Sequence, residues 1–280
     1  MLSFRATGWS LGLTGCQDVA AGLEAILYGW GVERTDRGAP DAEIAREGDG
    51  EGDAFVWSSA ARPKPHLWDK RPPETAMSVV TDIHDVFIDW FLADHPELLC
   101  LHAGAVEMGE GLVVFPSVGK SGKSTLAVTL AARGHRFICD DVLPIDPVTV
   151  AGQALGIAPL LRKPVPETAG LAAFVTDRAG PSNKNWTYVK LGPKEMAPFG
   201  LRRPIAALVL LERQERAAPL LAPVAKAEML KEAILQNFGA HRAAAMVLDS
   251  LARLIEATDC YRLVYGDVAV AADLLEERFA

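Results

Sequence analysis

The residues best suited to chemistry are two lysines and three hydroxyl side chains in residues 119–125, which read Gly-Lys-Ser-Gly-Lys-Ser-Thr. An apolar run at 112–115 precedes them and a run of Leu, Ala and Val follows, which predicts a strand, a tight loop and a helix at 125–133. In that setting the N–H groups of the loop and the positive end of the helix hold phosphate oxygens. Lys123 then reaches the outer phosphates, and the Ser124 hydroxyl completes the shell of a magnesium ion.

The elements that flank this loop are stronger evidence for a phosphate site than the loop sequence itself. The usual phosphate loop begins with glycine where this chain has Ser117, and it has a small residue where this chain has Lys120. A bare Gly-Lys-Ser arises by chance in about one chain in ten of this length. The flanking strand and helix therefore decide the prediction of a nucleotide site. Its predicted residues are Ser117, Val118, Gly119, Lys120, Ser121, Gly122, Lys123, Ser124 and Thr125.

Two adjacent carboxylates, Asp140 and Asp141, follow the next predicted strand at 137–139. Phosphoryl transfer needs positive charge on the outer phosphate, which Lys123 and magnesium would supply, and a group that takes the proton of the acceptor hydroxyl. Because neighbouring side chains on a strand alternate sides, one aspartate can hold the metal while the other faces the acceptor. His102 lies in an apolar run, where a histidine is a hydrogen-bonded core residue or part of a site.

Composition limits the classes of partner. The chain has 280 residues, half of them hydrophobic, and a net charge of −8, which argues against a general nucleic-acid binder. Its four cysteines are scattered without zinc-binding spacing. No apolar run reaches the length of a membrane span, and the N-terminus lacks a signal-peptide core. We therefore expect a cytoplasmic protein with no nucleic-acid or membrane partner, and we leave open whether it forms a homo-oligomer.

The patterns predict an α/β chain with a small αβ N-terminal region, residues 1–74, before a larger domain, residues 75–280. In the first region we expect a hairpin within 3–16, a helix at 20–30 capped by Asp18, a surface loop at 33–53 and a strand at 54–58. The second begins with a helix from Thr75 to about His95, because Pro96 disfavours helix at the residue before it. Further predicted strands are 100–107, 143–145, 205–211 and 261–264, and further predicted helices are 227–238, 243–257 and 268–278.

The stretch 155–204 is the least regular, and long loops of this kind often carry function. It contains isolated basic residues in an acidic protein, among them Arg162, Lys163 and Lys184, which are either solvated surface charges or the lining of an anionic substrate site. We keep these three as candidate substrate-binding residues.

Four segments carry a family resemblance: LHAGAVE at 101–107, VGKSGKST at 118–125, RGHRFICDD at 133–141 and ALVLLE at 207–212. They resemble the catalytic core of the HPr kinase/phosphorylase family, and more closely the HPr-kinase-related proteins of peptide-modification clusters, including lasso-peptide kinases. The resemblance covers roughly residues 98–145 and 205–280. It implies an α/β fold with a P-loop mixed sheet of the HPr kinase/PEP carboxykinase type.

The resemblance also implies roles for single residues. Asp140 matches the general base, and Asp141 with Ser124 matches the metal ligands. His102 matches a histidine beside the reacting phosphoryl group, so the implied catalytic residues are Asp140, His102 and Lys123. Glu212 matches the glutamate that closes a family strand, and Lys226 lies near the expected substrate-side loop. No counterpart of the family's EIRGLG-type signature occurs between 150 and 180, so the resemblance does not extend to phosphorolysis or to HPr as acceptor.

The leading hypothesis is a kinase that uses ATP and Mg²⁺ to phosphorylate a serine or threonine hydroxyl of a peptide or small protein, such as a ribosomal lasso-type precursor peptide. One alternative is a kinase of a small-molecule alcohol or carboxylate. The other is a regulatory module that binds nucleotide without transferring phosphate. The sequence leaves open whether GTP or pyrophosphate can replace ATP.

Overall fold

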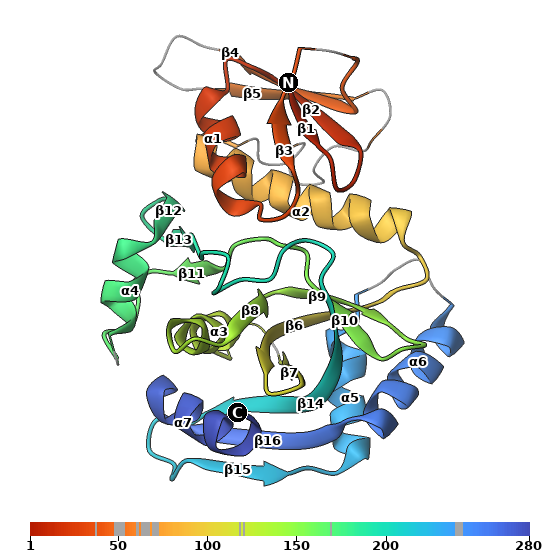
Figure 1. Cartoon of the computed structure of the whole chain (residues 1–280), viewed down its shortest axis with the longest axis vertical. Helices are drawn as coiled ribbons and strands as arrows, with labels where there is room; N and C mark the ends of the chain where they lie inside the picture. Colours follow the sequence, from red (N-terminus) through yellow and green to blue (C-terminus); the bar gives the residue numbers. More distant parts are fainter. Residues whose placement is uncertain are drawn as a thin grey trace.

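A computed structural model describes residues 1–36, 38–47, 54–59, 62, 68, 73–117, 119, 121–168, 170–238 and 243–280. Within these residues three sheets and seven helices form a mixed α/β fold, as the sequence predicts (Figure 1). None of the helices in these ranges combines the length and the apolar character that crossing a bilayer requires.

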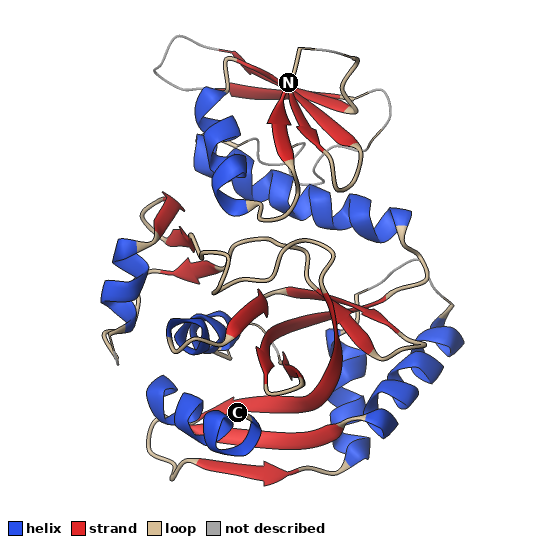
Figure 2. Cartoon of the chain, in the orientation of Figure 1, coloured by secondary structure: helices blue, strands red, loops and turns tan. Residues whose placement is uncertain are grey.

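The N-terminal layer is a five-stranded sheet, in the order β3-β1-β2-β4-β5, with two helices packed against it (Figure 2). The long helix α2 (Ala76–Asp94) begins where Thr75 Oγ1 accepts a hydrogen bond from the Ser78 N–H, 3.1 Å away. Its apolar face shares one core with α1 and also with Cys100, Val142 and Tyr188 of the following region, so the boundary expected after residue 74 stays a prediction. The other elements of this layer are β1 (Leu2–Phe4), β2 (Trp9–Thr14), α1 (Gln17–Ile26), β3 (Val32–Arg34), β4 (Ala42–Glu47) and β5 (Ala54–Ser58).

Two details of this layer differ from the sequence prediction. Helix α1 begins at Gln17, so Asp18 lies in its first turn, where it pairs with Arg46 of β4, and Asp18 is not the cap. The stretch 33–53 is not wholly a loop, because it contains most of β3 and all of β4. Short edge strands with few apolar residues give little periodic signal. Residues 48–53 of that stretch lie outside the described residues, as do most of residues 62–73, which are rich in proline.

The central sheet has the strand order β10-β9-β6-β7-β14-β16-β15, and β8 pairs with β6. Strands β7, β14 and β16 are parallel, so their carboxyl ends meet at one edge. Strand β10 pairs with both β9 and the start of β14, which curls this side of the sheet. The bounds are β6 (Leu99–Met108), β7 (Gly111–Pro116), β8 (Arg136–Cys139), β9 (Val142–Asp146), β10 (Ala151–Gln153), β14 (Arg202–Arg213), β15 (Leu220–Pro223) and β16 (Asp259–Tyr265).

Helices cover both faces of the central sheet. Along β7, Val113 and Phe115 pack toward α3 (Lys123–Ala132) and α7 (Val268–Phe279), while Leu112 and Val114 pack toward α5 and α6. A strand that is apolar at every position suits a sheet buried on both faces. The bounds of the second pair are α5 (Lys226–Gln236) and α6 (Ala244–Ala257).

The stretch 155–204 is not the long loop that its composition suggests. It folds into a three-stranded sheet with the helix α4 (Leu171–Asp177), and we call residues 160–189 the arm (Figure 1). Apolar side chains of the arm pack against Val128 of α3, which fixes the arm beside the loop that precedes α3. The strands of the arm are β11 (Leu160–Arg162), β12 (Ala179–Ser182) and β13 (Trp186–Val189).

Candidate active site

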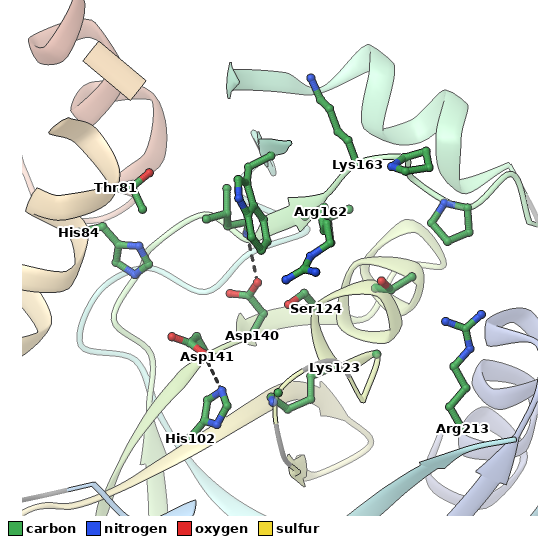
Figure 3. Close-up of a pocket in the computed structure, with 18 of the residues that line it drawn as sticks. Thr81, His84, His102, Lys123, Ser124, Asp140, Asp141, Arg162, Lys163 and Arg213 are labelled. Atoms are coloured by element: carbon green, nitrogen blue, oxygen red, sulfur yellow. Dashed lines mark hydrogen bonds and ion pairs between the residues drawn. The ribbon is translucent and has the colours of Figure 1, made fainter. Parts of the chain in front are cut away.

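A cavity of about 670 Å³ opens at the carboxyl ends of the parallel strands, the edge at which α/β sheets commonly bind ligands. We call it the main cavity. Its walls come from α2, β6, the loop before α3, the segment between β8 and β9, the arm and the end of β14 (Figure 3). Residues far apart in sequence that line it include Thr81, His84, Asp85, His102, Lys123, Ser124, Asp140, Asp141, Arg162, Trp186 and Arg213.

The loop from β7 to α3 is held at both ends. Ser117, in place of the usual glycine, is buried, and its Oγ accepts a hydrogen bond from the Leu211 N–H of β14, 3.1 Å away. Its carbonyl accepts from Lys123 Nζ, 2.7 Å away. Gly119 and Thr125 also line the cavity. The predicted binding residues Val118 and Lys120 lie outside the described residues.

Gly122 is required at the start of α3. Its φ is +97°, and a Cβ there would lie 2.4 Å from Tyr265 Oη, which donates a hydrogen bond to the Ser121 carbonyl. Gly134, just after the same helix, also has a positive φ, +99°, but a Cβ placed there would have no atom within 4 Å. Alanine at Gly134 would therefore introduce backbone strain alone, whereas alanine at Gly122 would add a steric clash.

We expect Gly134→Ala to lower the free energy of unfolding by about 1–2 kcal/mol, the cost of a left-handed alanine. Gly122→Ala should cost more and also weaken ATP binding, because it adds the clash with Tyr265. Chemical denaturation and calorimetry with MgATP measure both effects, and adding Tyr265→Phe to Gly122→Ala should recover part of each. Equal losses for the two single variants would mean that Tyr265 does not constrain the loop.

Lys123 projects from the first turn of α3 and is only 5% exposed. Burial lowers its pKa, and the charges of Asp141 and Asp140 oppose that shift. The glycine of LHAGAVE allows this approach, because a Cβ at Gly104 would lie 3.3 Å from Lys123 Cβ. A buried ammonium at a helix N-terminus, facing carboxylates, is suited to the outer phosphates of a nucleotide.

The acidic pair lies in the break between β8 and β9, which both pair with β6. Cys139 is opposite Ala105, and Val142 is opposite His102. Asp140 and Asp141 therefore lie beside the middle of β6, and the Asp141 carbonyl accepts a hydrogen bond from the Ala103 N–H, 3.0 Å away. This register explains why His102, remote in sequence, meets the pair.

The two aspartates face different partners. Asp140 accepts hydrogen bonds from the Ser124 hydroxyl and, at 3.1 Å, from the Leu160 N–H of the arm. Burial, with the charge of Asp141, raises the pKa of Asp140 to about 7. Asp141 Oδ1 lies 2.8 Å from His102 Nε2, and this contact lowers the pKa of Asp141 despite burial. His102 Nδ1 is in turn 3.1 Å from Gln236 Oε1 of α5.

The five substrate candidates separate into two groups. Arg162 lines the main cavity with its guanidinium 4.8 Å from the Trp186 ring, and Lys163 lines it with Nζ bonded to the Asn183 carbonyl. The other three lie outside it. Lys184 lines a separate hollow of the arm, Glu212 pairs with Arg262, and Lys226 pairs with Glu256 on α6.

Sequence reasoning missed Arg213, Asp85 and Gln236. Arg213 ends β14, one residue after Glu212, and lines the main cavity. The parallel pairing of β14 with β7 puts that strand end beside the loop. Because ligands of α/β sheets bind at the carboxyl ends of the strands, Arg213 could have been predicted from its position at the end of β14. Asp85 lies on α2. Burial of its carboxyl group, together with the charges of Asp141 and Asp89, raises the pKa of Asp85 to about 7. Neither Asp85 nor Gln236 has a local signal, because both reach the site through tertiary packing.

The donor set fits magnesium. The hydroxyl of Ser124 and the carboxylate of Asp140 are hard oxygen ligands in direct contact with each other. Within the described ranges no group of three or more His, Cys, Asp or Glu side chains is arranged to hold a metal. Magnesium that binds with a nucleotide needs only one or two carboxylates, since phosphate oxygens and water complete its shell.

No protein-family model matches the chain, and no curated protein is detectably similar to it. Among solved structures, it is similar to that of the HPr(Ser) kinase/phosphatase from Coxiella burnetii, with a TM-score of 0.34 and 14% sequence identity, over 64% of this chain and 88% of that chain. This is a distant similarity of fold, which says nothing of substrate or activity. The P-loop type of sheet remains a prediction.

Proposed function

We propose that the protein is an ATP-dependent phosphotransferase that phosphorylates a serine or threonine hydroxyl of a peptide or small protein, such as a ribosomal precursor peptide. The observation that carries this proposal is the convergence of Lys123, the Ser124–Asp140 pair and the Asp141–His102 pair in one cavity. A cavity of about 670 Å³ lies within the range of nucleotide-sized ligand sites.

The residues that would hold the donor are cationic or offer N–H groups. The triphosphate would bind at the loop before α3, with Lys123 at its outer phosphates and Arg213, at the end of β14, as a further cation (Figure 3). Trp186 and Arg162 of the arm would flank the rest of the nucleotide, since an aromatic ring and a guanidinium both stack on a base. Asp140 and Ser124 would hold Mg²⁺, which neutralises charge on the phosphates when bound.

The contacts favour an exchange of the roles that the resemblance implies for the two aspartates. Ser124 bonds to Asp140, whereas Asp141 is paired with His102 and the low pKa of Asp141 keeps it ionised at neutral pH. We therefore assign the metal to Asp140 and proton acceptance to Asp141. His102 would hold Oδ1 of Asp141 so that Oδ2 faces the acceptor hydroxyl.

In the transfer step, the acceptor oxygen forms a bond to the γ-phosphorus while the bond from that phosphorus to the ADP oxygen breaks. Asp141 takes the hydroxyl proton, and the electron pair of the broken bond leaves with ADP. Because the transition state is loose, the proton moves late, and a weakly basic carboxylate suffices. Lys123 and Arg213 offset the negative charge that moves onto the leaving oxygens.

The test is incubation with γ-labelled ATP and Mg²⁺ in the presence of serine-containing peptides, small alcohols or small carboxylic acids. We expect label in peptide serine or threonine, with one ADP released for each phosphate transferred, and little ADP without acceptor. Label confined to an alcohol or acid would favour the small-molecule kinase. Tight MgATP binding with no transfer to any of the three sets would favour the regulatory module.

A further inference from the structure

A second cavity, of about 450 Å³, adjoins the main one, and we call it the side cavity. Asp85, His102 and Asp141 line both cavities, so the Asp141–His102 pair stands at their boundary. A group bound in the side cavity therefore reaches the same pair, while Gly119 and residues 122–125 of the loop line the main cavity and not the side cavity. The remaining lining residues are Ile88, Asp89, Val142, Leu235, Gln236, Asn237 and Phe238.

The two cavities differ in their charged side chains. The main cavity has four cationic side chains, from Lys123, Arg162, Lys163 and Arg213, beside the carboxyl groups of Asp85, Asp140 and Asp141. The side cavity has the carboxyl groups of Asp85, Asp89 and Asp141, and the described residues that line it include no lysine or arginine. This division suits a polyphosphate in the main cavity and a cationic group in the side cavity.

The side cavity also has an exposed apolar wall. Leu235, in the last turn of α5, is 64% exposed, and Phe238, two residues after the helix ends, is 41% exposed. The wall is fixed to β6, because Asn237 forms a bridge with Leu101 and the Phe238 N–H donates to the Cys100 carbonyl at 3.3 Å. Large apolar side chains held in the open beside a cavity mark a binding surface.

One buried hydrogen-bond acceptor in this wall has no donor among the residues that the structure describes. Asn237 lines the side cavity, and its buried Oδ1 lacks a hydrogen-bond partner among the described residues. Buried polar atoms are nearly always paired in folded proteins, so an atom left without a donor points to a ligand N–H. A polypeptide backbone supplies such donors at regular spacing.

We propose that the side cavity is the acceptor site, and that it binds a polypeptide segment with a basic residue beside the acceptor hydroxyl and an apolar residue that packs on Leu235 and Phe238. This proposal rests on the proposed kinase function and adds the chemistry of its substrate. Asp85 faces the basic residue, the apolar wall anchors the segment, and Asn237 accepts from its backbone. A small amino alcohol would meet Asp85 but leave the apolar wall uncovered.

The carboxyl groups of the side cavity should also favour release of the phosphorylated product. Phosphorylation gives the acceptor close to two negative charges at neutral pH. The phosphorylated segment then faces Asp85 and Asp141 at short range, which weakens its binding relative to the unmodified segment.

The experiment uses three fluorescent nonapeptides that share a central serine and a leucine two residues away, and differ only in a lysine, glutamine or glutamate beside the serine. Anisotropy measures binding without turnover, and γ-labelled ATP measures kcat/KM for transfer. We expect the lysine peptide to bind about tenfold more tightly than the glutamate peptide, with Asp85→Lys reversing the order. Leu235→Ala should weaken all three, and the matched control Asp249→Lys, on the exposed face of α6, should preserve the wild-type order.

The two assays separate this proposal from the kinase itself. Charge-ranked binding that Asp85→Lys reverses supports the acceptor site even if no peptide is labelled, in which case the kinase assignment fails alone. Label transferred equally to the three peptides, or preferentially to the glutamate peptide, overturns the acceptor chemistry and leaves the kinase intact. If no peptide binds, or if only an amino alcohol is labelled, the polypeptide site is wrong.

Discussion

Replacing Lys123 by methionine should reduce phosphoryl transfer by about a hundred- to a thousand-fold, the usual effect of removing one preorganised donor from a site of developing charge. Methionine keeps most of the apolar stem, which packs in a nearly closed space beside Gly104. The variant therefore loses the ammonium and its bond to the Ser117 carbonyl while keeping the packing. MgATP affinity should also fall by at least about tenfold, since a charge-assisted hydrogen bond contributes about 1.5–3 kcal/mol.

The matched control is Lys194→Met, at an exposed lysine that lines none of the described cavities. It should keep both ATP affinity and transfer. Calorimetry and the labelled-ATP assay measure the two effects, and a denaturation curve establishes that each variant is folded. A folded Lys123→Met protein with wild-type ATP affinity would remove the phosphate site from the main cavity.

The strand, loop and helix of the candidate site were predictable from the sequence because they depend on local patterns. The run at 112–115, the glycines at 119 and 122 and the helix after them fix a strand, a loop and a helix within about twenty residues. The expected helices and strands after residue 204 are also present, and among the described residues there β15 is the one addition. Each is long or strongly apolar, which is where periodicity is most informative.

The rest of the site depends on contacts between distant segments. Asp85 and Gln236 reach the cavities from α2 and α5, and nothing near either residue in sequence distinguishes it from a helix surface position. The arm was missed for a different reason. Its strands have three or four residues each, too few for a period of two, and its glycines and prolines suggest a loop. Only its packing on α3 makes it a wall of the main cavity.

The different contacts of the two aspartates were also not predictable from the sequence. Adjacent aspartates on a strand suggest opposite directions but not which one meets the hydroxyl of Ser124. The register of β8 and β9 on β6 determines which aspartate makes this contact. It places Asp141 beside His102 and leaves Asp140 next to Ser124, at the start of α3.

We expect Asp141→Asn to lose about a hundred- to ten-thousand-fold in transfer rate, the usual contribution of a positioned base. The asparagine keeps the size of the side chain but cannot accept the acceptor's proton. MgATP affinity should change little, because Asp141 stands at the boundary of the two cavities and the proposed phosphate and metal ligands are Lys123, Ser124 and Asp140. His102→Gln should cost less, since it only releases one oxygen of the carboxylate.

Asp140→Asn is the matched comparison, since it is the same substitution one residue away. Asp140 and Ser124 are assigned to Mg²⁺, so this variant should need a much higher Mg²⁺ concentration for half-maximal transfer and recover much of its rate when Mg²⁺ is saturating. Mg²⁺ titrations of transfer for the two variants distinguish the assignments. If Asp140→Asn instead stays inactive at saturating Mg²⁺ while Asp141→Asn shifts only the Mg²⁺ dependence, Asp140 is the base and Asp141 the metal ligand, as the family resemblance implies.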